Sequence, residues 1–179
     1  MSKIEKIENY YSNGMLKEKG TIKNGRKDGL WTEVWVGGGV RSRSEGSYKN
    51  GKKDGKWTKF QYNIIGVLNY KSEGSFKDGK EDGKWIEWYD KEGKIKKSEH
   101  FYKDGESVGK WTEWYDWTKL HDDEGKIKES EHFYKDGKLD GLWTSWDEDG
   151  QIYKVDTYKK GKIISTKMWN EDGSLKTKV

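Results

Sequence analysis

Three histidines are the side chains of this chain best suited to metal binding or acid–base chemistry. His100 and His132 occupy the same position of two successive sequence repeats, where two earlier copies have Gly46 and Gly74. His121 lies in an insertion between repeats. A zinc site requires three or four converging ligands held by surrounding hydrogen bonds. Because the repeat stacks only two of the histidines, we expect half-exposed strand histidines, no bound metal and no other cofactor.

The carboxylates form a regular pattern as well. One column of glutamates recurs once per repeat near a column of lysines, namely Glu45, Glu73, Glu99 and Glu131 with Lys49, Lys77, Lys103 and Lys135. A glycosidase-type acid and base pair needs one carboxylate whose pKa is raised by burial, whereas recurring Glu and Lys columns are typical of a solvated surface. No nucleophile elbow, P-loop, dinucleotide fingerprint or HExxH motif is present. We therefore expect a protein that is not an enzyme.

The most regular feature is a tryptophan that closes a Gly-x-x-x-Gly-x-Trp segment. It recurs every 26 to 32 residues, a period typical of repeat architectures, at Trp31, Trp57, Trp85, Trp111 and Trp143. A second segment, EGSYKNG at 45–51, returns in related form at 73–79, 99–105 and 131–137. Aromatic and β-branched runs separated by Asn-Gly or Asp-Gly predict strands joined by tight turns. The second glycine of each segment, such as Gly55, either ends the turn or leaves room for a ring.

These segments predict an all-β fold, an elongated and twisted single antiparallel sheet of stacked β-hairpin repeats. About thirteen strands are expected in an up-and-down meander, because consecutive antiparallel strands usually pair with their sequence neighbours. We expect one domain over residues 1–179. Its predicted full units are about 25–50, 51–78, 79–104, 105–136 and 137–160, with partial units at 10–25 and 162–179.

The composition limits both the core and the partners. The 179 residues are 30% hydrophobic and 38% charged, with 15% aromatic residues, so large rings must supply most of the buried area. A net charge of +4 from 36 basic and 32 acidic residues lacks the basic patch of nucleic-acid binders, and we expect no nucleic-acid partner. The sequence has no cysteine and no apolar run suited to a signal peptide or a membrane span. A cytoplasmic location is expected, and membrane association is not.

Side-chain alternation divides the aromatic rings between two faces of the predicted sheet. The recurring tryptophans are assigned to the core, and the opposite face receives Phe60, Trp88, Trp114 and Trp146. These four rings either pack a second core or form an exposed strip that binds a partner. The insertion 116–124 adds Trp117 and His121, which fill no repeat position. All six residues are candidate partner contacts. Lysines near the C-terminal edge favour a monomer when free.

At these residues the chain resembles the MORN-repeat variant of bacterial proteins, whose unit runs approximately Y-x-x-G-x-x-x-G-x-W-x-x-Y. The resemblance extends over most of residues 10–179 and is carried by the segments 48–62, 76–96, 102–115 and 134–146. It implies a single twisted sheet of stacked hairpins. Many members are described as antitoxin or immunity proteins of toxin–antitoxin systems, and MORN repeats in general are associated with scaffolding and lipid binding.

The favoured hypothesis is a protein-binding module, an antitoxin or immunity-type inhibitor that occludes a partner protein such as a toxin. Broad contact by one sheet face with aromatic anchors would supply the binding. The alternatives are a structural scaffold or membrane-surface adaptor, and a glycan-binding module that uses the exposed aromatic strip.

Overall fold

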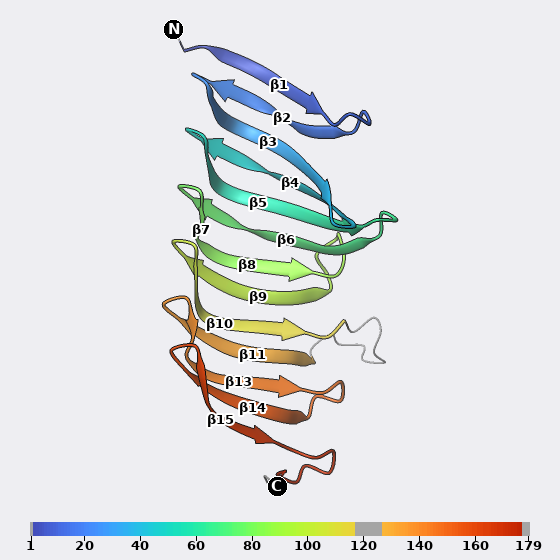
Figure 1. Cartoon of the computed structure of the whole chain (residues 1–179), viewed down its shortest axis with the longest axis vertical. Helices are drawn as coiled ribbons and strands as arrows, with labels where there is room; N and C mark the ends of the chain where they lie inside the picture. The colour runs from blue at the N-terminus through green and yellow to red at the C-terminus, as the bar shows by residue number, and fades with distance from the viewer. Residues whose placement is uncertain (1, 117–126, 177–179) are drawn as a thin grey trace.

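The computed structural model describes residues 2–116 and 127–176, and these residues form one antiparallel sheet of fifteen strands (Figure 1). The strands are β1 (Ile4–Tyr10), β2 (Leu16–Lys23), β3 (Arg26–Gly37), β4 (Val40–Lys49), β5 (Lys52–Asn63), β6 (Leu68–Lys77), β7 (Lys80–Glu81), β8 (Gly83–Trp88), β9 (Lys96–Lys103), β10 (Glu106–Trp114), β11 (Lys128–Lys135), β12 (Lys138–Leu139), β13 (Gly141–Trp146), β14 (Ile152–Lys159) and β15 (Lys162–Met168). Within this described part there is no helix long and apolar enough to cross a membrane.

The strand order confirms the predicted open meander. Thirteen strands follow one another in sequence order across the sheet, from β1 at one edge to β15 at the other. The two additional strands are short: β7 pairs with β6, and β12 pairs with β11. Asp82 separates β7 from the longer strand β8, and Asp140 separates β12 from the longer strand β13. Each short strand and the strand after it come from one predicted strand. Fifteen strands therefore correspond to the thirteen runs expected from the sequence.

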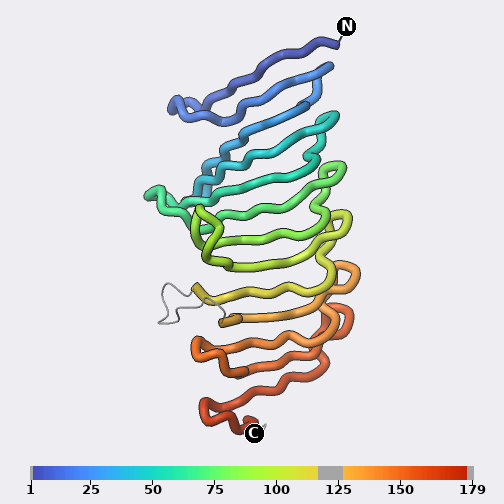
Figure 2. The backbone as a smooth tube through the Cα atoms, turned by 180° about the vertical axis from the view of Figure 1, so that it is seen from behind, coloured from blue at the N-terminus to red at the C-terminus, as the bar shows by residue number. Residues whose placement is uncertain are grey.

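The sheet is a single layer with an elongated shape. In Figures 1 and 2 the strands stack along the long axis, the turns lie along two edges, and the chain ends lie at opposite ends of the stack. No second layer of the described residues covers either face. Both faces are therefore available to place side chains against solvent or a partner.

The tight turns along one edge have the predicted geometry. Asn24, Asn50, Asp78, Asp104 and Asp136 have φ values of 51° or 52°, and each precedes a glycine with positive φ. Such values favour Asn, Asp and Gly at hairpin turns. The turns also bind one another: the Gly51 amide donates to the Lys27 carbonyl over 2.8 Å, and the Gly79 amide donates to the Lys53 carbonyl over 2.8 Å. These bonds hold successive units in register.

The core consists of tryptophan rings laid flat on the sheet. Trp31, Trp57 and Trp85 are 2%, 3% and 9% exposed. A side chain at the facing glycine would collide with each ring, because a Cβ at Gly46 would lie 2.3 Å from Trp57 and one at Gly74 would lie 2.0 Å from Trp85. The glycines that leave room for the indole rings are therefore Gly46 and Gly74, which lie in the neighbouring strands. The second glycines of the tryptophan segments, such as Gly55, have positive φ. Gly55 lies inside β5, at the bulge where the pairing with β4 shifts between Asp54 and Trp57.

Candidate functional site

The rings predicted on the face opposite the core tryptophans lie in one row across successive units. Phe60 is opposite Lys71, Lys71 is opposite Trp88, and Trp88 is opposite Lys96. Farther along the sheet, Trp114 is opposite Lys128. We call this row the aromatic–lysine strip; it consists of Phe60, Lys71, Trp88, Lys96, Trp114, Lys128 and Trp146.

The lysines of the strip lie against its indole rings. The Nζ atom of Lys71 is 4.9 Å from the Trp88 ring centroid, that of Lys96 is 4.9 Å from Trp114, and that of Lys128 is 5.3 Å from Trp146. At such distances the ring quadrupole attracts the ammonium group. Sequence analysis missed these lysines. Pairing each ring with its cross-strand neighbours could have found them, since Lys71, Lys96 and Lys128 lie on strands adjacent to those of Trp88, Trp114 and Trp146.

Glutamates flank the strip and neutralise its lysines. The Lys71 ammonium is 2.7 Å from Glu73, that of Lys96 is 3.0 Å from Glu99, and that of Lys128 is 2.7 Å from Glu131. Burial opposes ionisation of Glu99 and Glu131, but hydrogen bonds and charge from nearby lysines lower the pKa of both carboxyls overall. Three glutamates of the predicted column thus pair with strip lysines instead of the lysine column expected from the sequence, and the fourth, Glu45, pairs with Arg43.

Tyrosines of preceding units fix the strand ends that carry these rings. The Tyr89 hydroxyl donates to the Trp114 carbonyl over 3.2 Å, and the Tyr115 hydroxyl donates to the Trp146 carbonyl over 2.8 Å. Burial, followed by the charges of nearby carboxylates beginning with Glu129, raises the pKa of Tyr89 to about 12. Tyr89 therefore remains a hydrogen-bond donor throughout the neutral pH range.

The four strip rings are accessible on the sheet surface. Phe60, Trp88, Trp114 and Trp146 are all half-buried. The turn between β8 and β9 lies against Trp88, since a Cβ at Gly93 would be 3.6 Å from its indole ring. A second core behind the sheet is not formed by the described residues. The side-by-side rings with their ammonium groups can stack on, and donate hydrogen bonds to, a broad partner surface.

Two of the six predicted contact residues, Trp117 and His121, lie outside the described residues. The other four, namely Phe60, Trp88, Trp114 and Trp146, lie together in the strip.

The prediction that His100 and His132 are half-exposed is wrong. They are 5% and 4% exposed because they lie on the tryptophan side of the sheet, beneath rings of the following strands. His100 stacks on Trp111 with centroids 3.9 Å apart, and His132 stacks on Trp143 with centroids 4.1 Å apart. Burial lowers the pKa of both imidazoles. Among the described residues no group of three or more His, Asp or Glu side chains could hold a metal ion.

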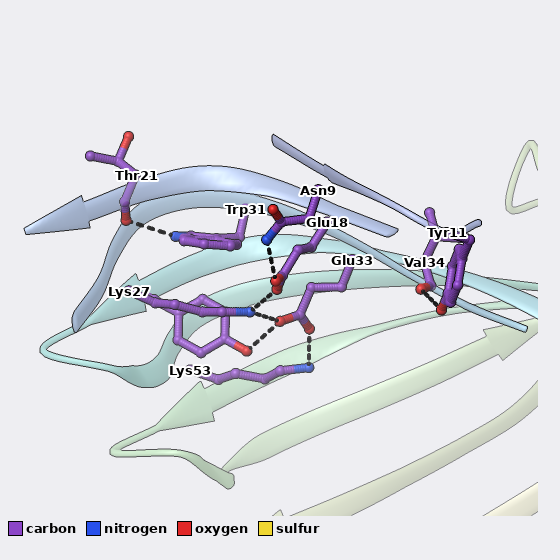
Figure 3. A network of polar contacts seen from close by, with 10 residues as sticks. Asn9, Tyr11, Glu18, Thr21, Lys27, Trp31, Glu33, Val34 and Lys53 are labelled. Carbon is purple, nitrogen blue, oxygen red and sulfur yellow. Dashed lines mark hydrogen bonds and ion pairs between the residues drawn. The ribbon is translucent and has the colours of Figure 1, made fainter. Parts of the chain in front are cut away.

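A charged network covers the N-terminal part of the tryptophan side (Figure 3). The Lys27 ammonium lies 2.7 Å from Glu18 and 2.7 Å from Glu33. The Tyr48 hydroxyl donates to Glu33 over 2.7 Å, and the Lys53 ammonium lies 3.4 Å from Glu33. Burial and the adjacent Glu33 carboxylate raise the pKa of Tyr48. These contacts satisfy the polar groups around Trp31 and leave few of them for a partner.

Comparison with known families agrees with the repeat resemblance. A family model described as MORN repeat variant matches residues 6–24 and 139–160. The first segment covers most of the β1–β2 hairpin, and the second runs from the end of β12 to the turn after β14. No curated protein matches the chain. MORN repeats are typically protein-binding or membrane-binding modules.

Proposed function

We propose that the chain is a non-enzymatic protein-binding repeat module, and that the aromatic–lysine strip is its contact surface. The observation that carries this proposal is the row of half-buried rings with lysines stacked against Trp88, Trp114 and Trp146. Large aromatic side chains dominate the binding energy of many protein interfaces.

The strip has the layout of an interface with a central row and a polar rim. Trp88 and Trp114 lie in the middle of the row, and Glu73, Glu99 and Glu131 accompany the lysines at its side. Carboxylates at the rim contribute little affinity but select the orientation and charge of the partner. The sheet holds the rings on strands, so little conformational entropy is lost on binding.

A more specific form of the proposal is an antitoxin or immunity-type inhibitor that acts in the cytoplasm. Occluding the active site of a toxin requires a broad rigid surface and no chemistry of the inhibitor's own. The single-layer sheet supplies such a surface, and the MORN-variant match at 6–24 and 139–160 supports the kind of repeat in which this role is described.

A membrane-surface adaptor is the second candidate, favoured by one apolar loop. Between β5 and β6, Ile64 and Ile65 are 84% and 79% exposed. Exposed aliphatic residues at a loop tip can insert at a bilayer interface. Co-sedimentation of the protein with anionic vesicles, lost in an Ile64→Ser/Ile65→Ser variant, would favour this candidate over the strip.

Capture and growth experiments test the proposal with one matched pair of variants. The product of the adjacent gene is the first partner to try, by pull-down and by co-expression in growing cells. We expect the Trp88→Ala/Trp114→Ala variant to bind at least about 30-fold more weakly than the native chain, equivalent to about 2 kcal/mol, and to lose any growth protection. Trp35→Ala removes an exposed indole outside the strip and should bind normally. Equal binding by both variants would rule out the strip.

A further inference from the structure

A ladder of edge-to-face rings runs along the tryptophan side of the sheet. Its contacts join Trp31 to Tyr48, Tyr48 to Trp57, Trp57 to Phe76, Phe76 to Trp85 and Trp85 to Tyr102, with centroid distances from 5.3 to 6.4 Å. The tryptophan and the second ring of each unit form a niche. The first niche is Trp31 with Tyr48, the second is Trp57 with Phe76, and the third is Trp85 with Tyr102.

The protein fills the first two niches with its own lysines. Lys27 Nζ lies 4.1 Å from the Trp31 centroid and 5.1 Å from that of Tyr48 (Figure 3). In the second niche, Lys53 Nζ lies 3.9 Å from the Trp57 centroid and 5.4 Å from that of Phe76. Glu33 is within 3.4 Å of both ammonium groups. Each niche therefore holds an ammonium between aromatic rings and a carboxylate.

The third niche has the same pair of aromatic rings, Trp85 and Tyr102, but no lysine lies between them and a carboxylate. The repeat position of Lys27 and Lys53, two residues after the turn glycine, is Glu81. The strand register agrees, since Lys53 is opposite Tyr48 and Glu81 is opposite Phe76. No lysine or arginine of the described chain lies over the Trp85 ring, which is 9% exposed, compared with 2% and 3% for the first two tryptophans.

Two carboxylates face the third niche. Glu81 and Glu87 line one surface groove together with Trp85, Tyr102 and His100. The Lys53 ammonium, which is paired with Glu33, lines the same groove as Glu81. Burial raises the pKa of the Glu81 carboxyl, and the charge of Lys53 partly opposes this rise. Glu87 is 3.0 Å from Lys97, whose ammonium lies over Tyr70 and not over Trp85. The groove thus combines an indole that carries no lysine of the described chain with acceptors for a cation.

The later units do not offer this combination. Trp111 stacks on His100 with centroids 3.9 Å apart, and the His132 ring lies nearly parallel to it at 5.7 Å. The position of Glu81 is Ser107 in that unit and Leu139 in the next. Within residues 2–116 and 127–176, only the third niche has a carboxylate at the lysine position and no lysine over its tryptophan.

We propose that the third niche binds a lysine side chain of a partner protein. Its ammonium would lie between Glu81 and Glu87, as Lys27 lies between Glu18 and Glu33, and its aliphatic stem would pack along Trp85 and Tyr102. That the lysine belongs to a protein rests on the proposed function. The affinity of the niche for an alkylammonium group does not depend on the strip and is tested separately.

The test uses Nα-acetyl-lysine methylamide as the probe and the Trp85 indole NMR signal as the readout. Titration of the full chain should shift this signal in a saturable way, and Nα-acetyl-norleucine methylamide, which lacks the ammonium, should not. Glu81→Lys should abolish the shift, because it introduces the protein's own lysine as in the first two niches. Glu81→Gln should weaken binding about tenfold, the loss of one charged hydrogen bond.

Glu106→Lys is the matched control, since it makes the same charge change at an exposed residue and should leave the titration unchanged. An unshifted Trp85 signal, an equal response to norleucine, or full binding by Glu81→Lys would each overturn the niche. The Trp88→Ala/Trp114→Ala variant should titrate normally, so a failure of the strip and a failure of the niche give different results.

Discussion

The N-terminal and C-terminal units solve the same packing problem in two ways. In the first units a glycine lies beneath each tryptophan, and Trp31 and Trp57 rest on bare backbone. In the later units His100 and His132 occupy the glycine position, and the next tryptophan stacks on an imidazole. Trp111 and Trp143 are consequently only half-buried. A recurring tryptophan therefore fixes the fold, while the residue beneath it decides how deeply the ring is buried.

The same two regions differ in their charges. The N-terminal tryptophans are covered by Lys27 and Lys53, whereas the histidine units have no lysine at that position. The Nδ1 atoms of His100 and His132 are buried without a hydrogen-bond partner in the described residues. An unpaired buried nitrogen costs free energy, so the C-terminal units should be the more easily perturbed by pH.

The largest expected effect is in the glycine units. Gly46→Ala places a Cβ 2.3 Å from the Trp57 ring. Because Gly46 does not have a positive φ, the substitution adds this steric clash without backbone strain. Overpacking of this kind should lower the free energy of unfolding by about 3 kcal/mol, measured by urea denaturation. Ser44→Ala, on the same strand and side, should cost less than about 1 kcal/mol. Equal losses would contradict the role assigned to Gly46.

A smaller effect is expected when a histidine unit is converted to a glycine unit. His100→Gly removes the stack on Trp111 and adds a flexible residue, so the free energy of unfolding should fall by about 1–2 kcal/mol. The Trp111 ring can then settle on the backbone, which should reduce its quenching by iodide. Increased quenching would show that the two kinds of unit are not interchangeable.

The lysines that lie over Trp31 and Trp57 should contribute less to the free energy of unfolding. Lys27→Met keeps the stem over Trp31 and removes the ammonium, so the loss should be about 1 kcal/mol and should shrink at high salt. Leu139→Met changes the equivalent position of the last unit, which is already apolar, and should have no salt-dependent effect. A salt-independent loss in Lys27→Met would mean that packing alone is responsible.

The pH dependence is the smallest and most selective difference. Burial lowers the pKa of His100 and His132 below the ordinary value of 6.5, a shift that Glu87 and Glu113 partly oppose at His100. The unfolded chain then binds more protons than the native one below this value. Stability is therefore complete above pH 6.5 and falls as the pH drops towards the folded-state pKa. Denaturation at a series of pH values should show this fall in the native chain and a weaker one in His100→Gly/His132→Gly. An equal fall in both would assign it to carboxylates.

The fold could be predicted because strand alternation and turn chemistry agree in every unit. Asp78-Gly79 and its equivalents specify the turns, and period-two alternation correctly placed Trp88 and Trp114 opposite the core. The burial of His100 was missed because its position is filled by glycine in earlier units, and sequence alone does not show that the glycine lies beneath a ring. The third niche was also missed, although the replacement of Lys53 by Glu81 in aligned repeats was visible.

Hydroxyl-radical footprinting tests most directly the claim that the aromatic–lysine strip is the contact surface. The chain would be oxidised alone and in complex with the partner recovered in the capture experiment, and the modified tryptophans identified by mass spectrometry. We expect the partner to lower oxidation of Trp88 and Trp114 and to leave the exposed Trp35 unchanged. Protection of Trp35 with unchanged oxidation of Trp88 and Trp114 would contradict it.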